Sequence, residues 1–223
     1  MQFFGLTEKT QWIRDFRTYW RELLFWLLLL PAFGALGSRE SNRQIAGLVE
    51  TCAFLVVAMS SMGRLKSLGL AFAAWNPLCE QGASICTLAG LLAGAIIASV
   101  ARLTGQPLGV ESGWNKVVLA VSLGPVLEEV IFRGYLFTAA LFFTGRMSGA
   151  RSTSISIVGI AVLFSIAHLA TPGITVLQLC CIGLTGSLYG YIRFRTRSTA
   201  AAALTHGMYN FTLYLAYWFG LAR

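Results

Sequence analysis

The sequence predicts an all-α fold, a polytopic transmembrane helical bundle of about seven to eight spans. The first observation is composition. The 223 residues are 56% hydrophobic and 12% charged, with a mean hydropathy of +0.68, which is too apolar for a soluble domain. The second is a series of apolar runs of spanning length along the chain. Residues 1–223 are therefore expected to form a single integral membrane domain.

The first 22 residues differ in character from the runs that follow. Cations alternate there with amphipathic aromatic side chains: Lys9, Arg14, Arg17 and Arg21 with Trp12, Phe16, Tyr19 and Trp20. This mixture is typical of a helix among the lipid headgroups, so residues 1–22 are predicted to form an interfacial helix. The next run, 23–36, is short and contains Pro31. We interpret it as a first span rather than a signal peptide, because the segment before it is long and partly acidic and several spans follow.

The remaining apolar runs are predicted to be spanning helices. In order they cover residues 45–62, 82–101, 117–143, 154–169, 174–191 and 200–220. The run 82–101 is rich in glycine and alanine, which predicts close helix packing. The run 117–143 is long enough to hold two shorter segments instead of one. Within it, Pro125 is expected to kink the helix and open a cavity.

Basic residues indicate how the spans are oriented. The formal net charge of +8 would suit nucleic acid, but the cations are dispersed between apolar runs and no soluble module gathers them into a patch. If the N-terminus is cytoplasmic and seven spans follow, most Lys and Arg residues fall on the inner side, as the positive-inside rule requires. We therefore expect a multi-pass protein, of the inner membrane if bacterial, with a cytoplasmic N-terminus and no nucleic-acid partner. An eighth span would return the C-terminus to the inside.

Ionisable residues in the middle of the run 117–143 are the first candidates for function. They are Glu128, Glu129 and Arg133. Each charge costs about 3 kcal/mol or more at that depth, so such a cluster marks a functional site by default. Glu129 and Arg133 are four residues apart and can pair on one helical face, whereas Glu128 points about 100° away. A desolvated Glu128 would hold a proton more tightly, as a general base needs near neutral pH, although the two glutamates could exchange roles.

The only two histidines of the chain lie in other apolar runs. His206 and Asn210 are four residues apart and could project together as two donors to a developing oxyanion. His168, from a different helix, would orient the water or the substrate. These are the parts that amide hydrolysis requires without a covalent intermediate. With the N-terminus inside, His168 lies at the outer end of its span and His206 near the inner end of the last one, so the hypothesis requires them to meet near the midplane.

Three motifs in order resemble the signature of the CPBP intramembrane protease family: Glu128-Glu129-x-x-x-Arg133, Phe164-x-x-x-His168 and His206-x-x-x-Asn210. That family includes type II CAAX prenyl endopeptidases and bacteriocin-processing and immunity proteins. The resemblance covers roughly residues 114–220, the expected catalytic core, while the earlier runs match only as generic spans. It implies a glutamate-dependent intramembrane endopeptidase. Its substrate would be a membrane-associated or lipidated peptide or protein, such as a prenylated one, cut near the C-terminus or in a leader.

The resemblance also implies a role for each motif residue. Glu128 would activate water with help from His168, and His206 with Asn210 would stabilise the oxyanion. Glu129 also belongs to the implied catalytic set, where it would act in support with Arg133. Phe164 is a further supporting residue, and we expect it to pack in the core rather than take part in the chemistry.

A zinc enzyme is one alternative. The family was long classed among the metalloproteases, and His168, His206 and Glu128 could supply three zinc ligands. If one glutamate were a ligand and Arg133 neutralised the other, no free base would remain. We therefore expect a mechanism that requires no cofactor.

Two other classes of protein fit the same residues. A non-catalytic membrane scaffold or immunity protein could keep the fold without cutting a peptide. A proton-coupled transporter could use the glutamates and histidines as a relay, although neither inverted repeats nor paired broken helices are evident. Each polar residue alone could also be an interhelical hydrogen bond. The cysteines form no CxxC pair and are predicted to be small apolar packing residues: Cys52, Cys79, Cys86, Cys180 and Cys181.

Overall fold

The computed structural model describes residues 82–110, 114–145, 147–171 and 173–221. Within these ranges the chain forms helices joined by turns and contains no strand, which confirms the all-α class for this part. The predicted interfacial helix, 1–22, and the apolar runs 23–36 and 45–62 lie outside the described residues.

Each later apolar run corresponds to a helix or a helical rod. The run 82–101 forms α3. The run 117–143 lies within one continuous helical rod, residues 114–144, rather than in two separate segments. The elements in order are α3 (Ala83–Thr104), α4 (Trp114–Val118), a π-helical segment (Leu119–Leu123), α5 (Gly124–Glu129), a second π-helical segment (Val130–Leu136), α6 (Phe137–Thr144), α7 (Gly149–Ala167), a 3-10 turn (His168–Ala170), α8 (Val176–Thr196) and α9 (Thr199–Trp218).

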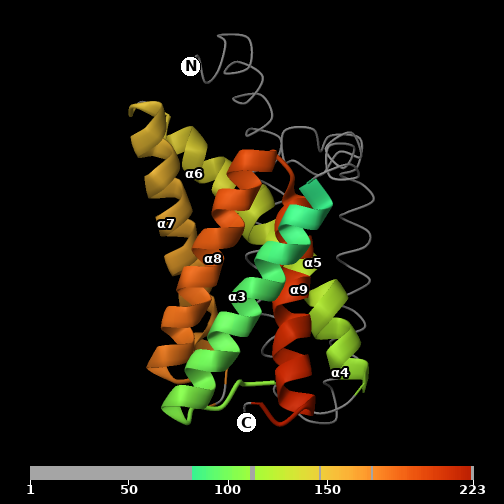
Figure 1. Ribbon diagram of the computed structural model, residues 1–223. Coiled ribbons are helices and arrows are strands. Elements are labelled where there is room, and N and C mark those ends of the chain that lie inside the picture. The colour runs from blue at the N-terminus through green and yellow to red at the C-terminus, as the bar shows by residue number, and fades with distance from the viewer. Residues whose placement is uncertain (1–81, 111–113, 146, 172, 222–223) are drawn as a thin grey trace, which may run out of the picture. The chain divides into compact units, whose positions relative to one another are not determined.

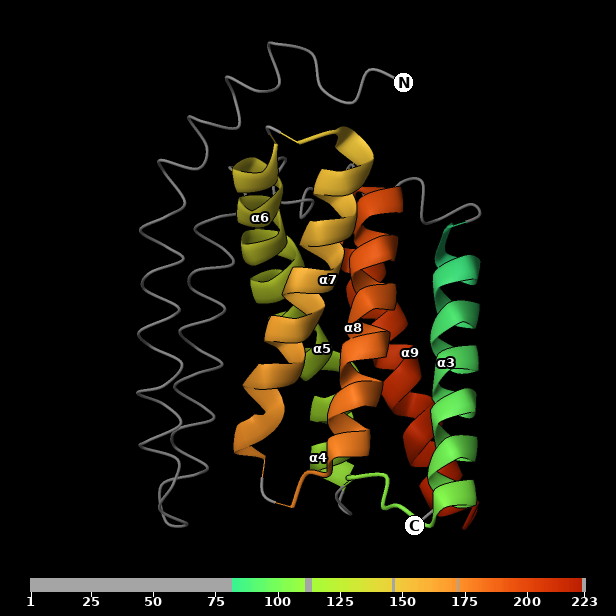
Figure 2. The same ribbon diagram turned by 90° about the vertical axis from the view of Figure 1, so that its left-hand side faces the viewer.

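Helix α9 is the centre of the bundle. It packs against α3, against α5 and against α8, while α8 also packs against α7. Figure 1 shows α3 and α9 side by side, and Figure 2 shows α7 next to α8, with α9 between α8 and α3. Elements far apart in sequence therefore meet around α9, which carries the last of the three motifs.

Two of the described helices are long and apolar enough to cross a membrane, α3 and α7. Helices α8 and α9 carry more polar residues, including Arg193 and Arg195 on α8 and His206 and Asn210 on α9. The count of seven to eight spans therefore stays a prediction.

Helix α3 has large apolar side chains outside and small ones inside. Its exposed residues include Ile85, Leu88, Leu92 and Ile96, whereas its buried residues are Cys86, Gly90, Gly94, Ala98 and Ala101. A Cβ on Gly90 would clash with the Thr205 carbonyl, and one on Gly94 would lie 2.6 Å from the Thr212 Cβ. The close packing predicted from the glycines and alanines is therefore confirmed. Such an outward apolar face suits contact with lipid.

The rod that holds the glutamates changes helix type just before them. Pro125 has no backbone N–H, so the Val121 carbonyl lacks the donor that an α-helix would give it. The Gly124 N–H instead bonds to the Leu119 carbonyl, five residues back, as in a π-helix. The Val121 carbonyl approaches α9 closely, because a Cβ on Gly207 would lie 2.5 Å from its oxygen. Pro125 thus alters the backbone ahead of the glutamates, and Gly207 permits the contact with α9.

Candidate active site

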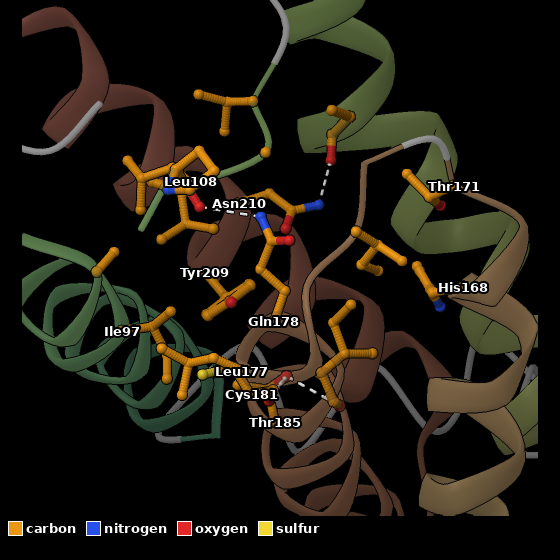
Figure 3. A pocket seen from close by; sticks show the side chains of 18 of the residues that line it. Ile97, Leu108, His168, Thr171, Leu177, Gln178, Cys181, Thr185, Tyr209 and Asn210 are labelled. Atoms are coloured by element: carbon orange, nitrogen blue, oxygen red, sulfur yellow. Dashed lines mark hydrogen bonds between the residues drawn. The ribbon is translucent and has the colours of Figure 1, made fainter. Parts of the chain in front are cut away.

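One cavity of about 580 Å³ collects residues from all three motifs. Its lining includes Glu128 from α5, His168 after α7, and His206 and Asn210 from α9. Figure 3 shows His168 and Asn210 reaching this cavity from different helices. The meeting of the two histidines that the sequence hypothesis required is therefore present, because both line the same cavity.

Glu129 lies at the centre of a buried polar cluster. Its Oε1 atom accepts a hydrogen bond from Arg133 Nη1 at 3.0 Å and lies 3.0 Å from His206 Nδ1. Both Glu129 and Arg133 are 0% exposed, and Arg133 Nη2 also donates to the Gly186 carbonyl at 2.8 Å. The predicted Glu129–Arg133 pair is present, and it joins the rod to α8 and α9.

Glu128 has a different environment. Its side chain is 39% exposed and lies beside that of His168, which is 28% exposed. The Glu128 Oε2 and His168 Nε2 atoms are 4.0 Å apart, too far for a direct hydrogen bond. Glu128 Oε2 has no hydrogen-bond partner among the described residues. Glu128 is therefore only partly buried, less than the sequence analysis expected. Of the two glutamates, it is the one that lines the cavity.

Hydrogen-bond partners indicate which ring nitrogen of each histidine is the donor. His168 Nδ1 lies 2.8 Å from the Phe164 carbonyl oxygen, which can only accept, so Nδ1 carries a hydrogen. His206 Nδ1 lies 3.0 Å from a carboxyl oxygen of Glu129, and that oxygen also accepts from Arg133. In both histidines Nδ1 is therefore the donor, and Nε2 is the nitrogen left for the cavity or its ligands.

Asn210 is fixed by the π-helical segment. Its Nδ2 donates to the Ala120 carbonyl at 2.7 Å, which leaves one further amide hydrogen. His206 and Asn210 both line the cavity, as their spacing predicted. One of the two amide hydrogens of Asn210 is used by the backbone.

Phe164 is buried between the two histidines. Its ring centroid lies 4.7 Å from that of His168 and 5.9 Å from that of His206. The Arg133 Cζ atom lies 4.4 Å from the same centroid. Phe164 is 2% exposed, so it is a core residue, as expected, and it separates the two halves of the site.

Sequence reasoning missed Tyr189 on α8. Its ring stacks on the His206 imidazole, with centroids 4.7 Å apart and planes 17° from parallel. Tyr189 belongs to none of the three motifs, and its position in an apolar run gave no signal that would have singled it out. Cys181 and Thr185, also on α8, line the cavity and were missed in the same way.

At the rim of the cavity, one hydrogen bond links the start of α8 to the segment that follows α3. Gln178 forms a capping box with Thr175 at the start of α8. Its Nε2 also donates to the Pro107 carbonyl at 2.9 Å, in the segment that follows α3. Gly109 in that segment has a φ of +71°, a conformation that favours glycine. Figure 3 shows Gln178 and its hydrogen bond to this segment, beside Leu108.

Among the described residues, no three His, Cys, Asp or Glu side chains form a group that could hold a metal ion. The His206 Nδ1 atom is directed to Glu129. The expectation of a mechanism that requires no cofactor stays a prediction. The three cysteines in the described ranges, Cys86, Cys180 and Cys181, are free thiols.

Comparison with known proteins gives one family. Residues 110–212 match the family described as type II CAAX prenyl endopeptidase Rce1-like, and this range contains all three motifs. Neither a curated protein nor a solved structure gives a significant match. The matched family is one of membrane-embedded proteases. Residues 110–212 therefore resemble the Rce1-like family, in agreement with the family resemblance predicted from the motifs.

Proposed function

We propose that the chain is an intramembrane endopeptidase in which Glu128 activates water to hydrolyse a peptide bond. The observation that carries this proposal is the difference in surroundings between the two glutamates. Glu129 is 0% exposed and its Oε1 is engaged by Arg133 and His206. Glu128 is 39% exposed, lines the cavity, and its Oε2 has no hydrogen-bond partner among the described residues, which is also true of Glu129 Oε2 in its buried position. A general base must have a free acceptor beside the reacting atoms, and Glu128 meets that requirement.

Glu128 and His168 can hold one water between them. Their facing atoms, Oε2 and Nε2, are both acceptors and lie 4.0 Å apart, so a water can donate one hydrogen to each. Its remaining lone pairs then point away from both residues, toward a carbonyl carbon in the cavity. Transfer of the proton to Glu128 as the water attacks makes the nucleophile, and His168 keeps the water oriented.

Asn210 and His206 are the residues proposed to stabilise the oxyanion. The second amide hydrogen of Asn210 is not needed by the Ala120 carbonyl and can be donated to the oxyanion, and the imidazole of His206 lines the same cavity. Donors held by the fold are effective because they need no reorganisation as the charge develops.

The rest of the lining supports a membrane-associated or lipidated substrate. Away from the glutamates the cavity is lined mainly by apolar side chains, among them Ile97, Leu108, Ile174, Leu177 and Leu213. An apolar compartment next to polar groups suits a substrate with an apolar chain or side chain beside the scissile bond. We propose peptides cut near a C-terminus, including prenylated ones, or in a leader.

The test compares wild type with Glu128→Gln in liposomes. The probes are a farnesylated CAAX peptide, the same peptide without the lipid, and membrane extracts whose new protein termini are mapped by mass spectrometry. We expect wild type to generate new termini and Glu128→Gln to lower the rate by about 10²-fold or more.

The matched control is the unfolding temperature of the same two preparations. Because Glu128 is partly exposed and has no hydrogen-bond partner to lose among the described residues, Glu128→Gln should leave it unchanged. Cleavage by Glu128→Gln at the wild-type rate would refute the assigned base. Absence of any cut terminus with wild type would favour a scaffold.

A further inference from the structure

We propose that Tyr189 is a positioning residue that holds the His206 imidazole with Nδ1 on Glu129 and Nε2 toward the cavity. Its effect on cleavage rests on the function proposed above, whereas its effect on the His206 ring does not. No motif includes this tyrosine, and it comes from α8, while His206 lies on α9 and Glu129 on α5.

One hydrogen bond does not fix an imidazole ring. The contact from His206 Nδ1 to Glu129 Oε1, at 3.0 Å, holds one atom of the ring and leaves the ring free to swing about that atom. The Tyr189 ring lies nearly parallel to the imidazole, 17° from it at 4.7 Å, which fixes the plane. The two contacts together determine where Nε2 points.

Tyr189 is itself held firmly enough for this role. It is 0% exposed, and its ring meets those of Phe164 and Tyr209 edge-on, at 6.5 and 6.3 Å. The Arg133 Cζ atom lies 5.4 Å from its centroid, and the same guanidinium binds the Gly186 carbonyl, one turn earlier on α8. Arg133 therefore sets Tyr189 and Glu129 relative to each other, and both contact His206.

The ring of Tyr189, rather than its hydroxyl, makes the contact. The contact is between the two rings, and no hydrogen bond joins the Tyr189 hydroxyl to His206 or to Glu129. Tyr189→Phe should therefore keep the positioning effect, whereas Tyr189→Met, which fills similar space without an aromatic face, should lose it.

The experiment observes the imidazoles directly. Protein labelled with ¹⁵N-histidine is placed in lipid nanodiscs, and because the chain has only two histidines, His168→Gln assigns both rings. In wild type and Tyr189→Phe we expect one His206 state, with the hydrogen on Nδ1. In Tyr189→Met we expect shifts that average between the two tautomers. Tyr189→Leu serves if the Met variant does not fold.

Phe137→Leu is the matched control. Phe137 is 1% exposed, so its loss destabilises the bundle, yet it does not line the cavity. Wild-type His206 signals in both Tyr189→Met and Tyr189→Leu would overturn the proposal. An equal change of the His206 signals in Phe137→Leu would also overturn it, because the effect would then come from general destabilisation of the bundle. A change in Tyr189→Phe as large as that in Tyr189→Met would overturn it as well.

Cleavage gives the second readout. With a peptide that wild type cuts, Tyr189→Met should lower kcat by about 10- to 100-fold through misplacement of a catalytic group, with KM little changed, and Tyr189→Phe should stay within about threefold of wild type. Equal loss in kcat and binding for Tyr189→Met would contradict positioning. If wild type cuts no peptide, the endopeptidase proposal fails, while the histidine signals still decide the role of Tyr189.

Discussion

At the scale of single residues, the two adjacent glutamates are distinguished by their surroundings. Glu129 is enclosed with Arg133 and His206, and Glu128 is left at the cavity. The i to i+4 spacing was sufficient to predict the Glu129–Arg133 pair, because both residues lie on one helix. The contact of His206 with Glu129 and the stacking of Tyr189 on His206 join different helices, so no spacing along the chain could have predicted them.

The first prediction concerns the buried pair. Arg133→Met should lower the free energy of unfolding by about 3–5 kcal/mol, because it leaves Glu129 charged, buried and without its cation. Glu129→Gln combined with Arg133→Met should recover a large part of that loss, since no unpaired charge remains. Both are measured by unfolding in detergent, with Glu128→Gln as control. If Arg133→Met were as stable as wild type, the pair would not be a stabilising element.

At the scale of elements, glycine positions show where helices touch. A Cβ on Gly207 would lie 2.5 Å from the Val121 carbonyl oxygen, whereas one on Gly159 in α7 would meet nothing within 4 Å. The composition of the run 82–101 predicted close packing for α3, but it could not indicate that α9 is the partner. The partner depends on how the helices are arranged in space.

The second prediction uses this contrast. Gly207→Ala should destabilise the protein by about 1–3 kcal/mol, because α9 must move away from the rod. Gly159→Ala should be neutral or stabilising by up to about 1 kcal/mol, since alanine favours a helix. Unfolding temperatures of the two variants in the same detergent check the prediction, and an equal loss in both would contradict the close contact at Gly207.

The third prediction concerns the tie at the cavity rim. Gln178→Leu keeps the size of the side chain but removes the hydrogen bond to the Pro107 carbonyl and the capping box with Thr175. We expect the segment 105–110 to exchange its amide hydrogens about tenfold faster, because losing about 1.4 kcal/mol of stabilisation makes local opening about tenfold more frequent. Hydrogen exchange measured by mass spectrometry tests this. Exchange unchanged in that segment would show that other contacts hold it.

At the scale of the whole molecule, apolar composition predicted the all-α class and the last five helical regions, because runs of this length are stable in lipid only as helices or closed barrels. It could not establish the number of spans. Helices α8 and α9 carry polar residues, some of them in the site and others, such as Arg193 and Arg195, outside it. Of the described helices, α3 and α7 are the two that are long and apolar enough to cross a membrane.

The fourth prediction concerns orientation in the membrane. With a cytoplasmic N-terminus, seven spans place the C-terminus outside and eight place it inside. Reporter fusions after residue 223, paired with fusions at the N-terminus, distinguish these counts. We expect the N-terminal fusion to report the cytoplasm. An outward N-terminus would contradict the orientation inferred from the basic residues.

The π-helical segment at 119–123 sets the rotational phase of the glutamates relative to Trp114, and the segment at 130–136 sets the phase of α6 relative to the glutamates. A π turn takes about one residue more than an α turn, so each segment acts as an insertion of one residue into the rod. Deleting a single residue from 119–123 would restore an α-helix and leave Glu128 facing nearly the same way, whereas winding all the same residues as an α-helix would rotate Glu128 by up to about 100° relative to Trp114. The direction in which Glu128 faces is therefore encoded in the winding of the residues before it as well as in their number.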